Sequence, residues 1–391
     1  MALFEIEEYQ ERVSKTKMSM TEKGIDILVV SDPANMNYLT GYDGWSFYVP
    51  QVVILSIDDD EPIWVGRGMD ANGAKHTTYL SHERIIGYAD DYVQTPIKHP
   101  MQVVADEIKK RGWDTKTIGT EMDAYYFSAK SFVELQNSLP NAKFDDANLL
   151  VSWVRIKKSA REIEFMQKAG KIAERVMQTA IDTVAPGVRE CDAVAEIYRT
   201  QIRGTDAYGG DYTSFVPMMP CGEKTSTPHL TWTDEPYQNE IAVNMELAAC
   251  HNRYHSPLAR TMYLGKNPPG NLVDTSKVVV EGCNTALDAI KPGVTCEEIE
   301  LAWRQVIARA GLEKESRIGY SVGLNYPPDW GEHTASLRPG DKTVLEPNMT
   351  FHMILGMWMD DWGFECSESL RVTDDGHETF ANFPRKLFTK N

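Results

Sequence analysis

The pattern that decides the fold occurs twice, as AIDTVAPGVRECDAVAEIYRTQI at residues 180–202 and as ALDAIKPGVTCEEIELAWRQVIARAG at residues 286–311. In each copy a helix-like segment ends, a Pro-Gly-Val turn follows, and a second helix with acidic residues near its start begins. Each copy is followed by strand-like sequence. A tandem copy of this kind predicts two halves related by a pseudo-twofold axis. The alternative is a chance match, because Pro-Gly turns between helices are common.

The first 150 residues alternate between helix-like and strand-like segments, which predicts an α/β layer architecture. We expect helices at 3–23 and 101–111, and strands at 25–30, 51–57, 62–65 and 117–120. A basic cluster then precedes a long amphipathic helix, where Ser159 and Glu162 have the spacing of a capping box. The sequence therefore predicts an α/β (α+β) protein with domains at 1–154 and 155–391.

Composition narrows the possible partners. The formal net charge is −17, so nucleic acid and anionic membrane surfaces would repel the chain; solubility or a salty cytoplasm would each favour such a charge. The six cysteines include no CxxC pair and do not resemble a disulfide framework. The N-terminus does not resemble a signal peptide, and no uncharged apolar stretch reaches about 18 residues. We expect a cytoplasmic protein.

Glu246 is the most informative reactive residue, because it lies in the otherwise apolar, strand-like segment 241–250. Strand alternation places Asn244, Glu246 and Ala248 on one face. A carboxylate on a buried strand is costly unless it is paired or functional. The alternative is a structural carboxylate whose partners satisfy it.

Other reactive side chains lie in short segments. His229 follows a proline, and a surface or structural histidine is the alternative to a functional one. Glu365 and Glu368 lie in GFECSESLRVTDDG at 363–376, with Glu368 just before an expected strand at 370–373; a solvent-facing strand end is its alternative. The aromatic loop YPPDWG at 326–331 is stiffened by its prolines, and it walls a small pocket or covers a core edge.

Several motifs together resemble the pita-bread superfamily of creatinase, prolidase, aminopeptidase P and methionine aminopeptidase. They are RIKKSAREIE at 155–164, HLTW at 229–232, LART at 258–261, GYSVGL at 319–324 and VTDDG at 372–376. The resemblance covers nearly the whole chain. It implies a small creatinase-like N-terminal α/β domain followed by a duplicated pita-bread domain with pseudo-twofold symmetry.

The resemblance also implies which residues stand at the metal-ligand positions of the family. Metal-dependent members bind a dinuclear centre with two Asp, one His and two Glu. Matched motif to motif, Glu246 stands at the first Asp, Pro257 at the second, Tyr320 at the His and Ile354 at the first Glu, and only Glu368 is retained. A divalent metal needs several oxygen or nitrogen donors, and Pro and Ile side chains supply none. We therefore expect a hydrolase with no metal and no cofactor.

Two stretches are more similar still to ectoine hydrolases, a metal-free group like creatinase: MELAACHNRYHSPLART at 245–261 and PPDWGE at 327–332. Ectoine and creatine each join a delocalised positive charge to a carboxylate. The resemblance implies ring opening of ectoine to N-acetyl-diaminobutyrate. Glu246 would be the nucleophile or water-positioning base, His229 the proton shuttle, and Glu368 the holder of the second amidinium N–H. The expected substrate-binding residues are Tyr254, His255, Arg260, Tyr326, Trp330 and His333.

The resemblance further implies a homodimer in which an N-domain loop of the partner closes each site. The aromatic stretch 44–48, with Trp45 and Phe47, is the candidate loop; packing at a domain interface is the alternative.

Three rival functions remain. Creatinase breaks the same class of C–N bond, an X-Pro metallopeptidase would need the replaced ligands, and a catalytically inactive binding domain would carry long acidic or disordered extensions that are not seen in this sequence.

Overall fold

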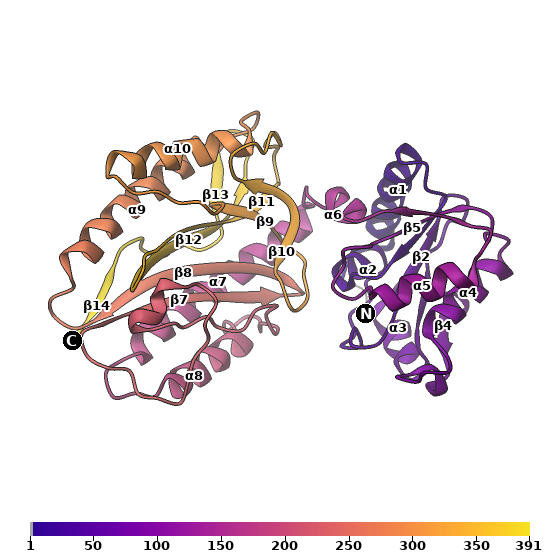
Figure 1. Ribbon diagram of the computed structural model, residues 1–391, viewed down its shortest axis with the longest axis horizontal. Coiled ribbons are helices and arrows are strands. Elements are labelled where there is room, and N and C mark those ends of the chain that lie inside the picture. The colour runs from indigo at the N-terminus through magenta and orange to yellow at the C-terminus, as the bar shows by residue number, and fades with distance from the viewer. Residues whose placement is uncertain (1–2) are drawn as a thin grey trace. The chain divides into compact units, whose positions relative to one another are not determined.

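The computed structural model describes residues 3–391, and the chain divides into two compact units, Met1–Arg155 and Ile156–Asn391. Both units appear in Figure 1. The division lies one residue from the boundary expected at 154. Within the described residues, no helix is both long and apolar enough to cross a bilayer.

The N-terminal unit is built on a sheet with the strand order β4-β3-β2-β1-β5-β6. Strand β1 is antiparallel to β2 and parallel to β5, so the sheet is mixed. Its strands are β1 (Ile27–Val30), β2 (Val52–Ser56), β3 (Ile63–Arg67), β4 (Ile85–Tyr88), β5 (Thr117–Thr120) and β6 (Lys143–Asp146). Its helices are α1 (Ile6–Glu22), α2 (Pro33–Thr40), α3 (Ala71–Thr77), α4 (Pro100–Lys110), α5 (Ala129–Ser138) and α6 (Leu150–Val154). The helices and strands expected here are all present, with small shifts at their ends.

The C-terminal unit contains two similar halves. The first half comprises α7 (Ala160–Thr183), α8 (Glu190–Arg203), β7 (Ile241–His251) and β8 (Tyr254–Leu264). The second comprises α9 (Gly270–Ala289), α10 (Cys296–Arg309), β9 (Gly319–Val322), β10 (Gly331–Leu337), β11 (Thr350–Trp358) and β12 (Gly363–Val372), followed by the short strands β13 (His377–Thr379) and β14 (Phe388–Lys390). Figure 1 shows the strands in the middle of this unit, with α9 and α10 on one side and α7 and α8 on the other.

The two Pro-Gly-Val turns form the same hydrogen bonds in both halves. Gly187 N donates to Tyr237 O, and Gly293 N donates to Leu345 O, both at 2.9 Å. In each half the returning segment donates back to the valine of the turn, at 2.9 and 2.8 Å. The glycines have φ values of +83° and +89°, a left-handed conformation that favours glycine. The predicted duplication is therefore confirmed in detail.

Ser159 begins α7 with the capping box expected from the sequence. Its side chain accepts a hydrogen bond from Glu162 N, and the Glu162 carboxylate accepts one from Ser159 N. These bonds satisfy two backbone donors that the first turn of a helix leaves without partners. One strand expectation is corrected, because the strand expected at 370–373 is the end of the longer strand β12.

Strand alternation gives each hairpin one face toward its helices and one face away from them. Four alternate apolar residues of β7 belong to the core with α7 and α8: Val243, Met245, Leu247 and Ala249. On β12, the residues in the core with α9 and α10 are Phe364, Cys366, Leu370 and Val372. Glu246 and Glu365 have the opposite parity. Both carboxylates therefore lie on strand faces that are turned away from the helices.

Replacing either turn glycine with alanine should cost the same stability. We expect Gly187→Ala and Gly293→Ala each to lower the free energy of unfolding by about 1 kcal/mol, because a side chain disfavours positive φ and nothing else lies within 4 Å of the added Cβ. Urea unfolding followed by circular dichroism measures this. Gly270→Ala, at the open start of α9, is the control and should be nearly neutral. Clearly unequal costs at the two turns would contradict their structural equivalence.

Candidate functional site

Glu246 lies in the middle of β7 with 4% of its surface exposed. It pairs across the hairpin with Ala259 and forms an isolated β-bridge with Met218 on its other side, so its backbone is held from both sides. Within residues 3–391 its carboxylate has no hydrogen bond or ion pair. Burial raises its pKa to about 7. A carboxyl of this kind can hold or release a proton near neutral pH.

Glu365 on β12 is the second buried carboxylate of the site, and the sequence interpretation gave it no role. It is 1% exposed, and in the described part of the chain its Oε2 atom has no hydrogen-bond partner. Burial, and then the charge of Glu246, raise its pKa well above the usual value, while the charge of Lys314 lowers it. The two carboxylates therefore lie close enough to influence each other. Such a pair favours sharing a proton or receiving a cation.

A chain of hydrogen-bonded side chains belongs to the same site. Trp330 Nε1 donates to Tyr320 Oη at 2.7 Å, and Tyr320 Oη lies 3.0 Å from His352 Nδ1. His352 Nε2 lies 2.8 Å from Ser367 Oγ, which accepts a hydrogen bond from Ala259 N at 2.7 Å. Glu246 influences the pKa of Tyr320, which burial raises well above its usual value. Trp330 was expected in the site, whereas His352 and Ser367 were not identified from the sequence.

His255 lies beside Trp330, with ring centroids 6.5 Å apart. It is 1% exposed, and its Nε2 atom accepts a hydrogen bond from Ser214 N at 2.9 Å. Burial lowers its pKa to about 3, so the imidazole is neutral at physiological pH. His255 is therefore brought to the edge of the site, where it supports the wall formed by Trp330.

Arg260 and Glu368 were expected at the substrate, and the structure pairs them with each other. Arg260 Nη2 lies 2.6 Å from Glu368 Oε1, which also accepts from Arg385 Nε at 2.9 Å. All three nitrogens of the Arg260 guanidinium donate to protein oxygens: four of the bonds go to backbone carbonyls and one to Glu368. Arg260 and Glu368 are both completely buried. Glu368 has the parity of the α9-facing residues of β12, opposite to that of Glu365. Within residues 3–391 its Oε2 atom has no hydrogen-bond partner, and its role at the substrate stays a prediction.

Tyr254 is also corrected from substrate binding to structure. It is completely buried, and its hydroxyl donates to Glu162 Oε1 at 2.7 Å. Its ring packs against Phe165 of α7, with centroids 5.6 Å apart. The side chain therefore ties the start of β8 to the first turns of α7.

The expected aromatic loop contributes residues of different kinds. Trp330 is completely buried and packs against Phe215, with centroids 4.4 Å apart, and Tyr326 is 2% exposed. His333 instead has a side chain that is 42% exposed, and its Nε2 atom lies 2.6 Å from Asp329 Oδ2. It borders a shallow groove that is also lined by Arg317 and Arg338. His333 therefore lies at an exposed border of the site, where the charge of its partner Asp329 acts on Tyr320 and His255, and its substrate-binding role stays a prediction.

His229 has an exposed side chain in the segment that follows the short 3-10 helix η4 (Gly222–Ser226). Within residues 3–391 its side chain has no hydrogen bond or ion pair. Its neighbour Leu230 accepts a hydrogen bond from Met219 N, and Met218 bridges to Glu246. The backbone of His229 is thus linked to β7 through one intervening segment, and its catalytic role stays a prediction.

Trp45 and Phe47 lie in the N-terminal unit. Their ring centroids are 4.8 Å apart, and Phe47 also contacts Tyr126 at 5.4 Å. Trp45 is 57% exposed and Tyr48 is 61% exposed. Within that unit they form an exposed aromatic cluster.

The donors at this site do not fit the dinuclear metal centre of the metal-dependent relatives. Across residues 3–391, no three His, Cys, Asp or Glu side chains are grouped so that they could hold a metal ion. Pro257 and Ile354 offer no donor, and the Tyr320 hydroxyl already accepts from Trp330. Glu246 and Glu365 alone would provide too few ligands for a stable centre.

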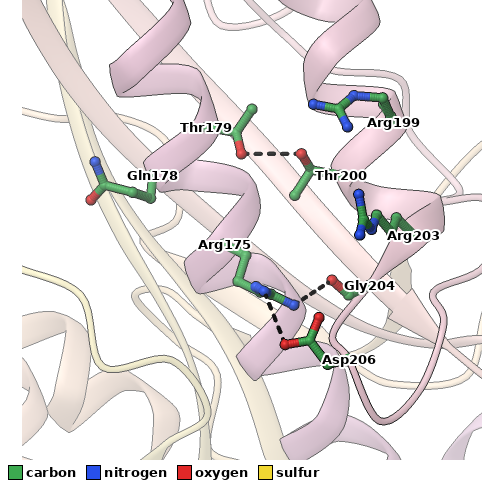
Figure 2. Close-up of a pocket in the computed structure, with 8 residues that line it drawn as sticks. All are labelled: Arg175, Gln178, Thr179, Arg199, Thr200, Arg203, Gly204 and Asp206. Atoms are coloured by element: carbon green, nitrogen blue, oxygen red, sulfur yellow. Dashed lines mark hydrogen bonds and ion pairs between the residues drawn. The ribbon is translucent and has the colours of Figure 1, made fainter.

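A cavity of about 410 Å³ lies between α7 and α8. Figure 2 shows residues that line it, among them Arg175, Arg199 and Arg203. Arg175 donates to Gly204 O at 3.0 Å and lies 3.8 Å from Asp206. The cavity lies in the helix layer, whereas Glu246 is on the opposite face of β7. It contains none of the expected site residues.

Comparison with known proteins agrees with this architecture. Residues 164–375 match the model of metallopeptidase family M24, and residues 12–157 match the creatinase/prolidase N-terminal domain. An ectoine hydrolase of Halomonas elongata is 46% identical over 394 residues, covering 99% of this chain and 98% of that protein. An uncharacterized hydrolase/peptidase of Sinorhizobium fredii is 47% identical over 98% of each chain. A prolidase structure from Thermococcus sibiricus has the same fold, with a TM-score of 0.85 at 19% identity, covering 98% of this chain and 99% of that one.

Burial of Glu246 should make stability depend on pH. Its pKa is about 7 in the folded protein against an ordinary 4.5, so its contribution to stability is lost as the pH rises through this window. The free energy of unfolding of Glu246→Gln minus that of the wild type should therefore increase with pH. Between pH 4.5 and pH 8 we expect this difference to rise by about 3 kcal/mol. Urea unfolding across this pH range measures the difference.

The control for this measurement is Glu368→Gln, which replaces the carboxylate between Arg260 and Arg385 with a neutral amide. It should lower stability throughout the pH range, because it leaves buried positive charge without its partner. Parallel stability curves for the wild type and Glu246→Gln would contradict the assignment of a raised pKa to Glu246.

Proposed function

This chain belongs to metallopeptidase family M24 and is a hydrolase, and from that premise we propose that it opens the ring of the cyclic amidine ectoine. The observation that carries the proposal is the pair Glu246 and Glu365: both are buried, and within residues 3–391 neither has an opposite charge within hydrogen-bonding distance. An amidinium spreads one positive charge over two N–H groups, and buried carboxylates are its natural partners. The 46% identity to the ectoine hydrolase of Halomonas elongata supports the same substrate.

Glu246 is the catalytic carboxylate in this proposal. As a base it takes a proton from water while the water oxygen bonds to the amidinium carbon and the C=N electron pair moves to nitrogen. The departing nitrogen then takes a proton through His229, and the C–N bond breaks with its electron pair on nitrogen. The proton of the carbinol O–H ends on the amine. The products are the amide and ammonium groups of N-acetyl-diaminobutyrate.

Direct attack by Glu246 is the other route. Its carboxylate oxygen bonds to the amidinium carbon as the C=N electron pair moves to nitrogen. The departing nitrogen takes a proton through His229 and leaves with the C–N electron pair, while the other nitrogen re-forms C=N to give an acyl imidate on Glu246. Water then bonds to the imidate carbon and expels the Glu246 carboxylate; one water proton returns to His229, and the other ends on the amine as ammonium. Glu365 replaces Glu368 as the second carboxylate facing the amidinium, because Glu368 is held by Arg260 and Arg385. Trp330 and Tyr326 supply the apolar wall beside the ring.

Turnover should depend on Glu246 and on an amidine substrate. We expect Glu246→Gln to lower kcat for ectoine by at least about 10³-fold, because the variant has neither a base nor a nucleophile. Glu235→Gln, on an exposed carboxylate of the same unit, is the matched control and should keep wild-type turnover. Chromatographic detection of the ring-opened product measures the rate, with creatine and an X-Pro dipeptide as parallel substrates. Near-normal turnover by Glu246→Gln would sink the mechanism, and exclusive cleavage of the dipeptide would sink the substrate assignment.

We also propose that the reaction needs no metal ion, which Pro257 and Ile354 at two ligand positions support. Dialysis against a chelator should therefore leave ectoine turnover unchanged, and elemental analysis should find less than one equivalent of transition metal. Activity lost on chelation and restored by Mn²⁺ or Co²⁺ would overturn this part of the proposal.

We further propose a homodimer in which the exposed aromatic cluster around Trp45 and Phe47 approaches the partner's site. An exposed aromatic cluster of this kind is typical of a protein interface. Sedimentation velocity should give the mass of two chains, and Trp45→Ser should weaken the dimer and raise KM for ectoine. A monomeric wild-type protein with full activity would contradict the arrangement.

A further inference from the structure

The hydrogen-bond chain from Trp330 to Ala259 has fixed donors at both ends. The indole N–H of Trp330 and the backbone N–H of Ala259 can only donate, and they do so to Tyr320 Oη and Ser367 Oγ at 2.7 Å each. Between these two hydroxyls lies the His352 ring, 3.0 Å from Tyr320 and 2.8 Å from Ser367. The positions of the two hydroxyl protons and of the His352 ring proton therefore follow from counting donors and acceptors along the chain of hydrogen bonds.

His352 carries one ring proton, because burial lowers its pKa to about 3. If the proton is on Nε2, His352 donates to Ser367, Tyr320 donates to His352, and the Ser367 hydroxyl proton points out of the chain. If the proton is on Nδ1, Ser367 donates to His352, His352 donates to Tyr320, and the Tyr320 hydroxyl proton points outward. In each arrangement one O–H is left to find an acceptor elsewhere.

Burial decides between the two arrangements. Ser367 and His352 are completely buried, and Ser367 has no further hydrogen-bond acceptor within the described residues. An outward Ser367 O–H would therefore be an unsatisfied buried donor, which opposes folding. Tyr320 is partly exposed and lies within the electrostatic influence of Glu246. The arrangement with the Nδ1 proton is thus favoured.

We infer that the His352 tautomer fixes Tyr320 as an O–H donor into the site, where it binds the oxygen that becomes bonded to the attacked carbon. This inference rests on the proposed function for the identity of that oxygen. Two donors, Trp330 and His352, occupy the lone pairs of Tyr320 Oη, which strengthens its O–H as a donor. Such a preorganised donor stabilises negative charge that develops on oxygen during the reaction.

Nitrogen-15 NMR of histidine-labelled protein tests the proton assignment without any substrate. The His352 signals, identified by their absence in His352→Gln, should show a protonated Nδ1 and an unprotonated Nε2 from pH 5 to pH 8. A protonated Nε2 would overturn the inference, because it would place the outward proton on Ser367. The result does not depend on whether the protein hydrolyses ectoine.

Kinetics test the role of the donor. Tyr320→Phe should lower kcat by about 10²-fold or more, as expected for the loss of one preorganised donor, while KM changes by less than about threefold. Tyr198→Phe, on α8, is the matched control and should keep the wild-type kcat. A Tyr320→Phe protein that is folded by circular dichroism and keeps its kcat would overturn the role, whereas a wild type without ectoine turnover would refute the proposed function instead.

Discussion

Two carboxylates that face away from the helices, Glu246 and Glu365, are the constraint on which the rest of the site depends. Glu246 lies in the middle of β7 and Glu365 near the start of β12, and within residues 3–391 each is buried without an ion pair. Burying an ionised carboxylate without a partner opposes folding by several kcal/mol. The two apolar cores, one in each half of the duplicated domain, must offset this cost. The fold thus maintains a site whose charge is balanced only when a proton or a cation enters it.

Strand alternation separates the pair Glu246 and Glu365 from a third buried carboxylate, Glu368, which lies only three residues from Glu365. Glu365 and Glu368 lie on the same strand but on opposite faces, so only one of them can meet Glu246. Glu368 is neutralised by Arg260 and Arg385, and this buried ion pair links β8, β12 and the C-terminal segment. The arginine of the LART motif therefore stabilises the framework, and it is not available to bind a substrate carboxylate.

The sequence was sufficient for the fold because its signals there are local. The Pro-Gly-Val turns, the capping box at Ser159 and the apolar strands each depend on residues near one another in the chain, and each is present in the structure. Glu246 was also predictable, since a single carboxylate in an apolar strand has few explanations. Arg260 and Tyr254 were misassigned because their partners are far away in sequence: Glu368 lies 108 residues from Arg260, and Glu162 lies 92 residues from Tyr254. Glu365 was within reach of the sequence, because treating 363–372 as one continuous strand assigns it and Glu368 to opposite faces.

The replacements at the metal-ligand positions have a coherent electrostatic consequence under the proposed function. A dinuclear centre brings four positive charges to its carboxylates, so a site that lost the metals and kept every acid would be strongly self-repelling. Pro257 and Ile354 remove two of those acids, and Glu368 is neutralised by Arg260 and Arg385. Glu246 is left at the fourth acidic position, and it can share one proton with the neighbouring Glu365. One organic cation, such as an amidinium, then matches the charge that is left. Tyr320 stands at the position of the metal-binding His and adds no charge to the site. Held by Trp330 and His352, its hydroxyl can donate a hydrogen bond that stabilises developing negative charge. On this reasoning the substitutions act together: restoring a single ligand, such as Asp in place of Pro257, would add a third buried acid and raise the cost of folding before it created a metal site.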